Sequence, residues 1–125
     1  MKKGIVVLGH GSRANMSEAN QVVFQMADMV KEKLDHDLVE AAIINRMSKL
    51  QTLTEAVERL ISRGAESVTV APMFFANGTH IQSDIPEEIG TIQARNPGIP
   101  IRLAQHIGAD TRIADILVER AREAW

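Results

Sequence analysis

Four short apolar runs alternate with longer stretches of helical periodicity, and this alternation constrains the fold more than any other feature of the chain. The runs are Ile5 to Leu8, Leu38 to Ile44, Ser67 to Ala71 and Ile99 to Ala104. The first run contains no alternating polar residue, which is typical of a strand covered on both faces. Four β-α units predict a parallel sheet with helices on both faces and right-handed connections. We predict an α/β fold with strand order 2-1-3-4, a single flavodoxin-like lobe spanning residues 1–125.

The first two helices are marked by their caps and their apolar periodicity. A helix is expected from about Ser17 to Leu34, with apolar residues spaced on one side. The second should begin at Thr52-Leu53-Thr54-Glu55, which has the pattern of a capping box, and should stop near Gly64.

The last two helices are also marked by capping signals. A long loop, Pro72 to Ser83, is expected before a third helix that starts at Asp84-Ile85-Pro86-Glu87, where an acidic cap precedes an early proline. Asn96-Pro97-Gly98 should end that helix. Asp110 or Thr111 should cap the fourth.

Composition narrows the class of protein. The chain has 125 residues, 45% of them hydrophobic, which is enough for the core of one domain. The net charge is −2 and basic residues are scattered, so no nucleic-acid surface is expected. Cysteine is absent, which excludes disulfides and thiolate sites. No segment approaches the ~20 apolar residues of a membrane span, and no signal peptide is evident. We therefore expect a cytoplasmic protein with no membrane partner.

Two histidines follow apolar runs. His10 lies in Gly9-His10-Gly11 directly after the first run, and His80 follows the third run within Asn77-Gly78-Thr79-His80. The predicted strand order makes these strands neighbours, and ligands bind at the carboxyl edge of open α/β sheets. Two imidazoles at that edge indicate a metal site or a proton-transfer site. The alternative for each histidine is a loop residue that hydrogen-bonds to the backbone.

Other side chains are expected at the same edge. Ser12 and Thr79 flank the histidines and are suited to hydrogen-bonding a ligand carboxylate. Three cations, Arg13, Arg46 and Lys49, would suit a polyanionic ligand, although a solvated surface is their ordinary role.

An apolar segment and two further titratable residues complete the candidate edge. Met73, Phe74 and Phe75 form an apolar segment that serves either the core or a flat ligand. Asp84 is expected to cap the third helix, or to orient His80 and accept protons. His106 follows the fourth run at an outer strand of the same edge.

A glycine-rich loop offers an alternative function. Gly9-x-Gly11-x-x-Ala14 superficially matches a dinucleotide-binding loop. That fold places an acidic residue at the end of the second strand to hold the ribose. Here that strand closes with Ile43-Ile44-Asn45-Arg46. A nucleotide-binding module is therefore the weaker interpretation.

The paired motifs resemble a known family. Val7-Leu8-Gly9-His10-Gly11-Ser12-Arg13, together with Pro72-Met73-Phe74-Phe75, Gly78-Thr79-His80 and Asp84-Ile85-Pro86, is similar to the short sirohydrochlorin chelatases, the cobaltochelatase family of the cobalamin pathway. The resemblance spans nearly the whole chain. It implies a chelatase-like lobe that inserts a divalent ion into a tetrapyrrole without ATP, with His10 and His80 as metal ligands. It also implies a homodimer, since short members resemble one half of longer two-lobed chelatases.

The chemistry agrees with that resemblance. Metal insertion requires that the ion lose water and that two pyrrole N–H protons leave. Neutral imidazoles bind Co²⁺, Ni²⁺ and Fe²⁺ and accept protons near neutral pH. The metal, Co²⁺ foremost, is thus expected as a substrate, and no prosthetic group is expected. Arg13, Arg46 and Lys49 would bind the carboxylates of sirohydrochlorin at the rim of the cleft.

One departure from the family pattern affects the expected activity. Where family members often carry an acidic residue after the second strand, this chain has Asn45, so a proton acceptor or metal ligand is missing. A carrier that binds a tetrapyrrole or a metal without inserting the metal is therefore a rival to the enzyme.

Overall fold

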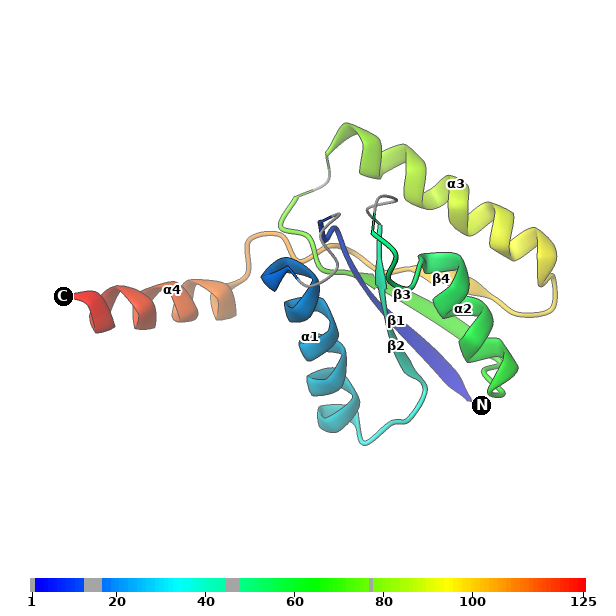
Figure 1. Ribbon diagram of the computed structural model, residues 1–125, viewed down its shortest axis with the longest axis horizontal. Helices are drawn as coiled ribbons and strands as arrows, with labels where there is room; N and C mark the ends of the chain where they lie inside the picture. The colour runs from blue at the N-terminus through cyan, green and yellow to red at the C-terminus, as the bar shows by residue number, and fades with distance from the viewer. Residues whose placement is uncertain (1, 13–16, 45–47, 77) are drawn as a thin grey trace.

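The structure, a computed structural model, describes residues 2–12, 17–44, 48–76 and 78–125, and it describes residues 79–81 by their backbone alone. Strands and helices alternate along the chain (Figure 1). The elements are β1 (Lys3–Gly9), α1 (Glu18–Leu34), β2 (Val39–Ile43), α2 (Leu53–Ser62), β3 (Ser67–Pro72), α3 (Thr79–Arg95), β4 (Ile101–Leu103) and α4 (Thr111–Ala124).

The four strands form one parallel sheet in the order β2-β1-β3-β4, which confirms the predicted topology. Val7 in the middle of β1 pairs with Ala41 of β2 and with Ala71 of β3. β1 and β3 are therefore direct neighbours, and the segments that follow them leave the sheet at the same edge.

Helix α1 covers the β1–β2 half of one face of the sheet. Its N-cap is Ser17, whose side chain accepts a hydrogen bond from the Asn20 amide, and it ends at Asp35 in the left-handed region with φ 48°. Val23 and Ala27 of α1 are buried in a cluster with Val7 and Ala41. Both ends of this helix agree with the sequence-based expectation.

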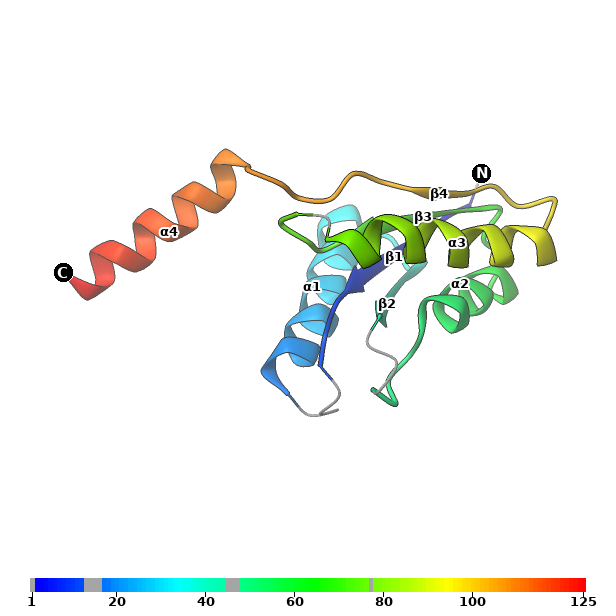
Figure 2. The ribbon, with the colours of Figure 1, turned by 90° about the horizontal axis from the view of Figure 1, so that it is seen from above.

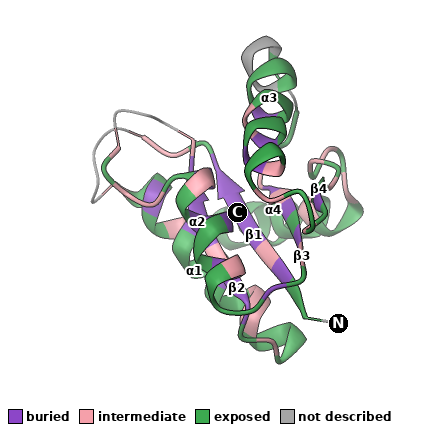
Figure 3. Cartoon of the chain, turned by 90° about the vertical axis from the view of Figure 1, so that its right-hand side faces the viewer, coloured by how far each residue is buried: buried purple, intermediate pink, exposed green. Residues whose placement is uncertain are grey.

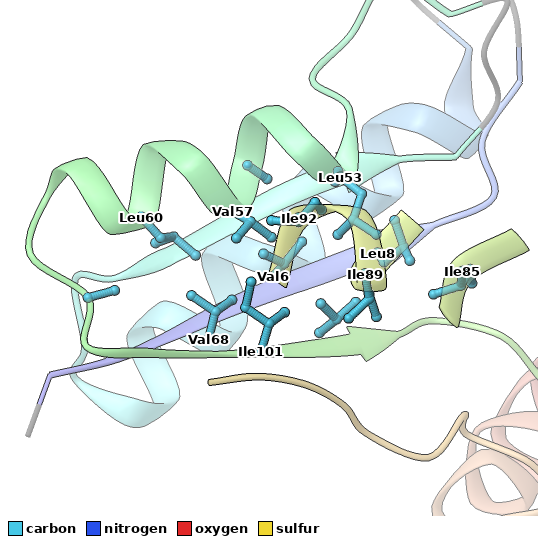
Figure 4. Close-up of a cluster of buried hydrophobic side chains, with 14 of the residues drawn as sticks. Val6, Leu8, Leu53, Val57, Leu60, Val68, Ile85, Ile89, Ile92 and Ile101 are labelled. Carbon is cyan, nitrogen blue, oxygen red and sulfur yellow. The ribbon is translucent and has the colours of Figure 1, made fainter. Parts of the chain in front are cut away.

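Helices α2 and α3 cover the opposite face. The capping box at Thr52 and Glu55 is present at the start of α2. Side chains of β1, β3, α2 and α3 interdigitate there in the larger core cluster (Figure 4). Its largest fully buried members are Leu8, Leu60, Ile92, Val6, Val57, Val68 and Val70. Figure 3 shows the buried positions gathered on the strands and on the inner sides of these helices.

The start of α3 differs from the prediction. The helix begins at Thr79, after the extended N-cap Gly78, and Pro86 lies inside it. The expectation of a loop as far as Ser83 and of a cap at Asp84 was wrong. An acidic residue two positions before a proline is typical of a helix start, but here the helix tolerates the missing N–H of Pro86 in its interior. His80 therefore lies in the first turn of a helix and not on a loop.

Helix α4 lies apart from the sheet (Figures 1 and 2). Within the described residues no other helix or strand approaches it, and none of its side chains is buried. Its N-cap is Asp110, which accepts hydrogen bonds from the Arg112 backbone amide at 2.8 Å and from the Arg112 guanidinium at 2.7 and 2.8 Å. That guanidinium holds the pKa of Asp110 well below its usual range. No helix among the described residues is long and apolar enough to cross a membrane.

Candidate functional site

The carboxyl edge of the sheet brings together the segments that follow β1, β2 and β3. The Met73 amide donates to the Leu8 carbonyl at 2.7 Å, and the Ile44 amide donates to the Gly9 carbonyl at 2.9 Å. These bonds extend the pairing one step beyond the strands. They place the residues that follow β2 and β3 on either side of the His10 loop.

His10 is exposed immediately after β1. Its Nδ1 lies 3.2 Å from the Gly11 carbonyl oxygen. Because a carbonyl oxygen can only accept, this hydrogen bond requires the proton on Nδ1. The lone pair is then on Nε2, the atom through which such a histidine would bind a metal or accept a proton.

The two glycines around His10 are required by close packing. A Cβ at Gly9 would collide with Val23 of α1, and a Cβ at Gly11 would collide with the side chains of Asn20 and Ile43. Gly11 also has φ +68°, which side-chain-bearing residues rarely adopt. The Gly-His-Gly sequence thus lets the chain turn tightly between α1 and β2 while the imidazole points outward.

Asn20 holds this loop in place and was not identified from the sequence. Its Oδ1 accepts from the Ser12 amide at 2.8 Å, and its Nδ2 donates to the Ser12 carbonyl at 2.9 Å. The Ser12 hydroxyl also donates to Ser17 Oγ at 2.8 Å. Asn20 is fully buried, and among the described residues it is the only polar or charged residue that is buried. The available signal was an amide within the apolar stripe of the first helix.

A cavity of 440 Å³ adjoins His10 on the α1 side of the sheet. It is lined by Gly9, His10, Gly11, Glu18, Ala19, Val22, Val23 and Met73. Glu18 was also not singled out from the sequence. It lines the same cavity as His10, and an acidic residue there favours a cation over an anion.

Several predicted site residues lie outside the described part of the structure. Arg13, Asn45 and Arg46 are not described, and Thr79 and His80 are described by their backbone alone. The approach of His80 to His10 thus stays a prediction. Among the described side chains, no three histidine, aspartate or glutamate residues are grouped as a metal site.

The aromatic and acidic candidates fall in different environments. Phe74 is buried in the larger core cluster, whereas Phe75 is 66% exposed. Of these two rings, only Phe75 is accessible to a ligand. Asp84 is exposed within α3, one helical turn after His80. Residues four apart on a helix share a face, so the corrected start of α3 makes Asp84 a neighbour of His80 along the helix.

His106 belongs to a second cavity at the same edge. This cavity, of 360 Å³, is lined by Pro72, Gln82, Ile85, Pro86, Leu103, Ala104, Gln105 and His106. The Ile107 amide donates to the Phe74 carbonyl at 2.8 Å, which ties the segment after β4 to the segment after β3. His106 is half-buried in this cavity, beside the first turns of α3.

The parallel α/β lobe with its Gly-His-Gly loop at the carboxyl edge agrees with the resemblance to metal chelatases, and comparison with known proteins shows that class. The CbiX family model matches residues 4–124. The chain belongs to the CbiX family and is a short-form chelatase of that family.

Two curated relatives and two solved structures illustrate the match. The chain is 37% identical to a sirohydrochlorin cobaltochelatase of Sulfurisphaera tokodaii, over 96% of this chain and 92% of the relative. It is 31% identical to a sirohydrochlorin ferrochelatase of Priestia megaterium, over 95% of this chain but 43% of the relative.

Among solved structures, a CbiX protein from Marinobacter aquaeolei VT8 superposes with a TM-score of 0.78 at 27% identity, over 98% of this chain and 96% of that one. The chelatase SirB from Bacillus subtilis subspecies spizizenii, in complex with cobalt, superposes with a TM-score of 0.82 at 27% identity, over 98% of this chain and 51% of that one. The fold is therefore that of the CbiX and SirB chelatases.

Proposed function

We propose that this chain, as one chelatase lobe over residues 1–125, inserts a divalent metal ion into sirohydrochlorin without ATP, and that Co²⁺ is the favoured ion. The observation that carries the proposal is the exposed imidazole of His10 in a tightly packed glycine loop, at the edge where β1 and β3 both end. Family membership and the names of the curated relatives support the same reaction.

The reaction exchanges two protons for one metal ion. The ion loses bound water, four tetrapyrrole nitrogens bind it, and the two pyrrole N–H protons leave. We assign metal binding to His10 and His80. With two protein ligands the ion is held weakly enough to be transferred, whereas a structural site usually closes with four. The same imidazoles are suited to receive the departing protons.

The remaining candidates would position the substrate. Thr79 would donate a hydrogen bond to a substrate carboxylate, and Ser12 would do so when its hydroxyl turns from Ser17 Oγ toward the ligand. Arg13 and Arg46 would pair with the same carboxylates. Phe75 is the exposed aromatic ring suited to the macrocycle face. In α3, Asp84 lies one turn after His80 and would accept a proton or orient that residue.

We further propose that the protein acts as a homodimer. One lobe offers one wall for a flat macrocycle, and Phe75 leaves apolar surface exposed beside the site. The chain spans 43% of the length of the ferrochelatase relative and 51% of the length of SirB. A second copy would supply the wall that the longer chains have room to provide themselves.

The direct test is an insertion assay. Sirohydrochlorin is titrated into the protein and followed by absorbance, and Co²⁺, Ni²⁺ or Fe²⁺ is then added in separate runs. The proposal expects a metal-dependent spectral change faster than the uncatalysed reaction, and fastest with Co²⁺. Sirohydrochlorin binding without faster insertion would indicate a carrier. Absence of sirohydrochlorin binding would contradict both interpretations and leave the nucleotide-binding alternative.

A further inference from the structure

His106 lines a cavity to which the proposed mechanism gives no role. This cavity of 360 Å³ lies where β3 and β4 end and α3 begins, at the same edge of the sheet as the His10 loop. Its apolar lining comes from both sides, with Pro72 and Leu103 from the strands and Ile85 from α3. Its polar lining residues are Gln82, Gln105 and His106. The cavity therefore suits a ligand that is partly aliphatic and partly polar.

Backbone hydrogen bonds fix the segment that carries His106. The Ala104 amide donates to the Val70 carbonyl at 2.8 Å, which extends the pairing of β4 with β3. The Ile107 amide is bound to the segment after β3, so Gln105 and His106 are the two residues between these attachment points. Because their backbone is held at the sheet edge, the half-buried imidazole needs little ordering to bind a ligand.

The polar side chains of the cavity are hydrogen-bond donors. Within the described residues, the side chains of Gln82, Gln105 and His106 have no hydrogen-bond partner. An imidazole has a ring N–H to donate whether it is neutral or protonated, and each glutamine has an amide NH₂. None of the described residues that line this cavity is acidic, whereas Glu18 lines the cavity beside His10. A carboxylate is therefore favoured here over a cation.

We propose that this cavity binds a carboxylate on a short aliphatic side chain of the tetrapyrrole, and that His106 selects that side chain. This inference rests on the proposed function. The ring N–H of His106 donates to a carboxylate oxygen, the amides of Gln82 and Gln105 are further donors, and the aliphatic carbons contact Ile85 and Leu103. The volume is at the small end of the range for ligand pockets, so it accommodates a side chain and not the macrocycle.

One ligand can reach both this cavity and the proposed metal site. Pro72, which lines the cavity at the end of β3, is paired with Leu8 of β1, two residues before His10. Strands lie about 4.8 Å apart and rise about 3.3 Å per residue, so Pro72 and the His10 loop are separated by on the order of 10 Å. Gln82, on the other wall, follows His80 by two residues in α3. A tetrapyrrole bound at His10 covers much of this distance with its ring, and a side chain spans the rest.

Attachment to the macrocycle favours a substrate side chain over a free acid. A free small acid would bring only a few atoms into the cavity and would lose its translational freedom on binding. A side chain of a tetrapyrrole that is already bound enters the cavity in an intramolecular step. The cavity should therefore raise the affinity for the tetrapyrrole although it binds small acids weakly.

Binding of sirohydrochlorin in the absence of metal tests the assignment. His106→Leu removes the ring N–H and keeps an apolar side chain, whereas His106→Gln restores a donor. In an absorbance titration, the dissociation constant should rise about tenfold for His106→Leu, as for a lost hydrogen bond to a charged group, and should stay within about twofold of wild type for His106→Gln. Arg102→Leu is the matched control and should bind like the wild-type protein, because Arg102 is an exposed cation of β4 outside the cavity lining. Far-UV circular dichroism checks that the variants fold.

Two further measurements distinguish the carboxylate site from other roles of His106. Calorimetric Co²⁺ titration without tetrapyrrole should give the same affinity for the wild-type protein and His106→Leu. Propionate at about 1 mM, the probe for a free acid, should leave sirohydrochlorin binding unchanged. Weaker Co²⁺ binding in His106→Leu would assign His106 to the metal site, and competition by propionate that His106→Leu abolishes would assign the cavity to a free acid. Either result would overturn the proposal.

The sirohydrochlorin titration separates failure of this inference from failure of the proposed function. Wild-type affinity in His106→Leu, an equal loss in Arg102→Leu, or no recovery in His106→Gln would overturn the carboxylate site alone. A wild-type protein that binds no sirohydrochlorin would contradict the proposed function as well.

Discussion

The side-chain amide of Asn20 holds both backbone polar groups of Ser12, with Oδ1 2.8 Å from the Ser12 nitrogen and Nδ2 2.9 Å from the Ser12 oxygen. Ser12 lies two residues after His10. A fully buried side chain of α1 therefore fixes the loop that carries the exposed imidazole, and packing beneath the sheet edge is linked to the geometry of the candidate site.

Replacement of Asn20 should weaken both the fold and the proposed reaction. Asn20→Ala removes two hydrogen bonds to a part-buried loop, at a cost of about 1–3 kcal/mol in the free energy of unfolding. The initial rate of Co²⁺ insertion should also fall, because the His10 loop loses its support. Urea denaturation and the insertion assay measure the two effects. Asn96→Ala, which removes a single bond to Ile92 at the end of α3, should lower stability while leaving the insertion rate of the folded protein unchanged.

Alanine substitution should have opposite effects on stability at two glycines. Gly11→Ala places a Cβ at φ +68°, against Asn20 and Ile43, and should destabilise the protein by about 2–4 kcal/mol. Gly90→Ala lies inside α3, where a Cβ meets open space. It should stabilise the protein by about 0.5–1 kcal/mol because alanine favours the helix. Equal effects of the two substitutions in thermal denaturation would refute the packing argument for the His10 loop.

Both histidines should be needed for metal insertion. His10→Ala and His80→Ala should each lower the initial insertion rate by roughly 10²-fold or more, the usual size of a lost proton-transfer group, while far-UV circular dichroism stays unchanged. His36→Ala is the matched control, because His36 bonds to the Lys3 carbonyl at the opposite edge of the sheet. Rates close to wild type in both site variants would end the two-histidine mechanism.

What the sequence predicted well depends on local signals. A few neighbouring residues are enough to predict the caps at Ser17 and Thr52 and the apolar spacing of α1 and α2. The strand order follows from general rules for β-α units. The predicted start of α3 was wrong because Asp84 and Pro86 have the pattern of a helix start. The helix begins earlier, after its N-cap Gly78. Hydrophobic periodicity places Asn20 within the apolar stripe of α1, but it does not identify its partners, which are the backbone N–H and C=O of Ser12 in a loop.

Helix α4 shows a second limit of prediction from the sequence. Its apolar spacing predicts a buried side, and periodicity does not identify the surface that buries it. Similarly, Phe74 and Phe75 are adjacent and chemically equal, and the position of the chain after β3 buries the first and exposes the second. Only the arrangement of elements in space distinguishes these cases.

The capping box of α2 should make stability depend on pH. Glu55 accepts a hydrogen bond from the Thr52 amide at 3.0 Å, and Thr52 accepts one from the Glu55 amide at 3.1 Å. The bond from the Thr52 backbone is the main cause that lowers the pKa of Glu55 from its ordinary value of 4.5. A lowered pKa in the folded state means that this stabilisation is present above pH 4.5 and is lost as the pH falls through the folded-state pKa.

The Thr52 side chain also lowers the pKa of Glu55, and Thr52→Ala removes this second contribution while keeping the backbone bond. Thr52→Ala should therefore cost about 1 kcal/mol in the free energy of unfolding at pH 7 and less at pH 3, where the Glu55 carboxylate of the wild-type protein is becoming protonated. Glu55→Gln keeps a side-chain oxygen without the charge, so its stability difference from the wild-type protein should shrink over the same pH range. Urea denaturation at the two pH values measures both. A Thr52→Ala cost that grows toward pH 3 would reverse the sign and contradict the role of the Glu55 carboxylate.

The final prediction concerns Asn45, which follows the residue whose amide bonds to Gly9, the neighbour of His10. An amide cannot take a proton or neutralise a dication. If this position serves the metal, Asn45→Glu should tighten Co²⁺ binding, because an anion attracts the ion in a partly dry cleft. Protons compete with metal for histidine ligands at low pH. The gain should thus be clearest above about pH 7, past the ordinary pKa of an imidazole near 6.5. Calorimetric Co²⁺ titration at pH 6 and pH 7.5 measures it, with Asn45→Gln as the uncharged control. Equal affinities of all three proteins at both pH values would place Asn45 outside the metal site, and its difference from the acidic family pattern would then carry no consequence for the reaction.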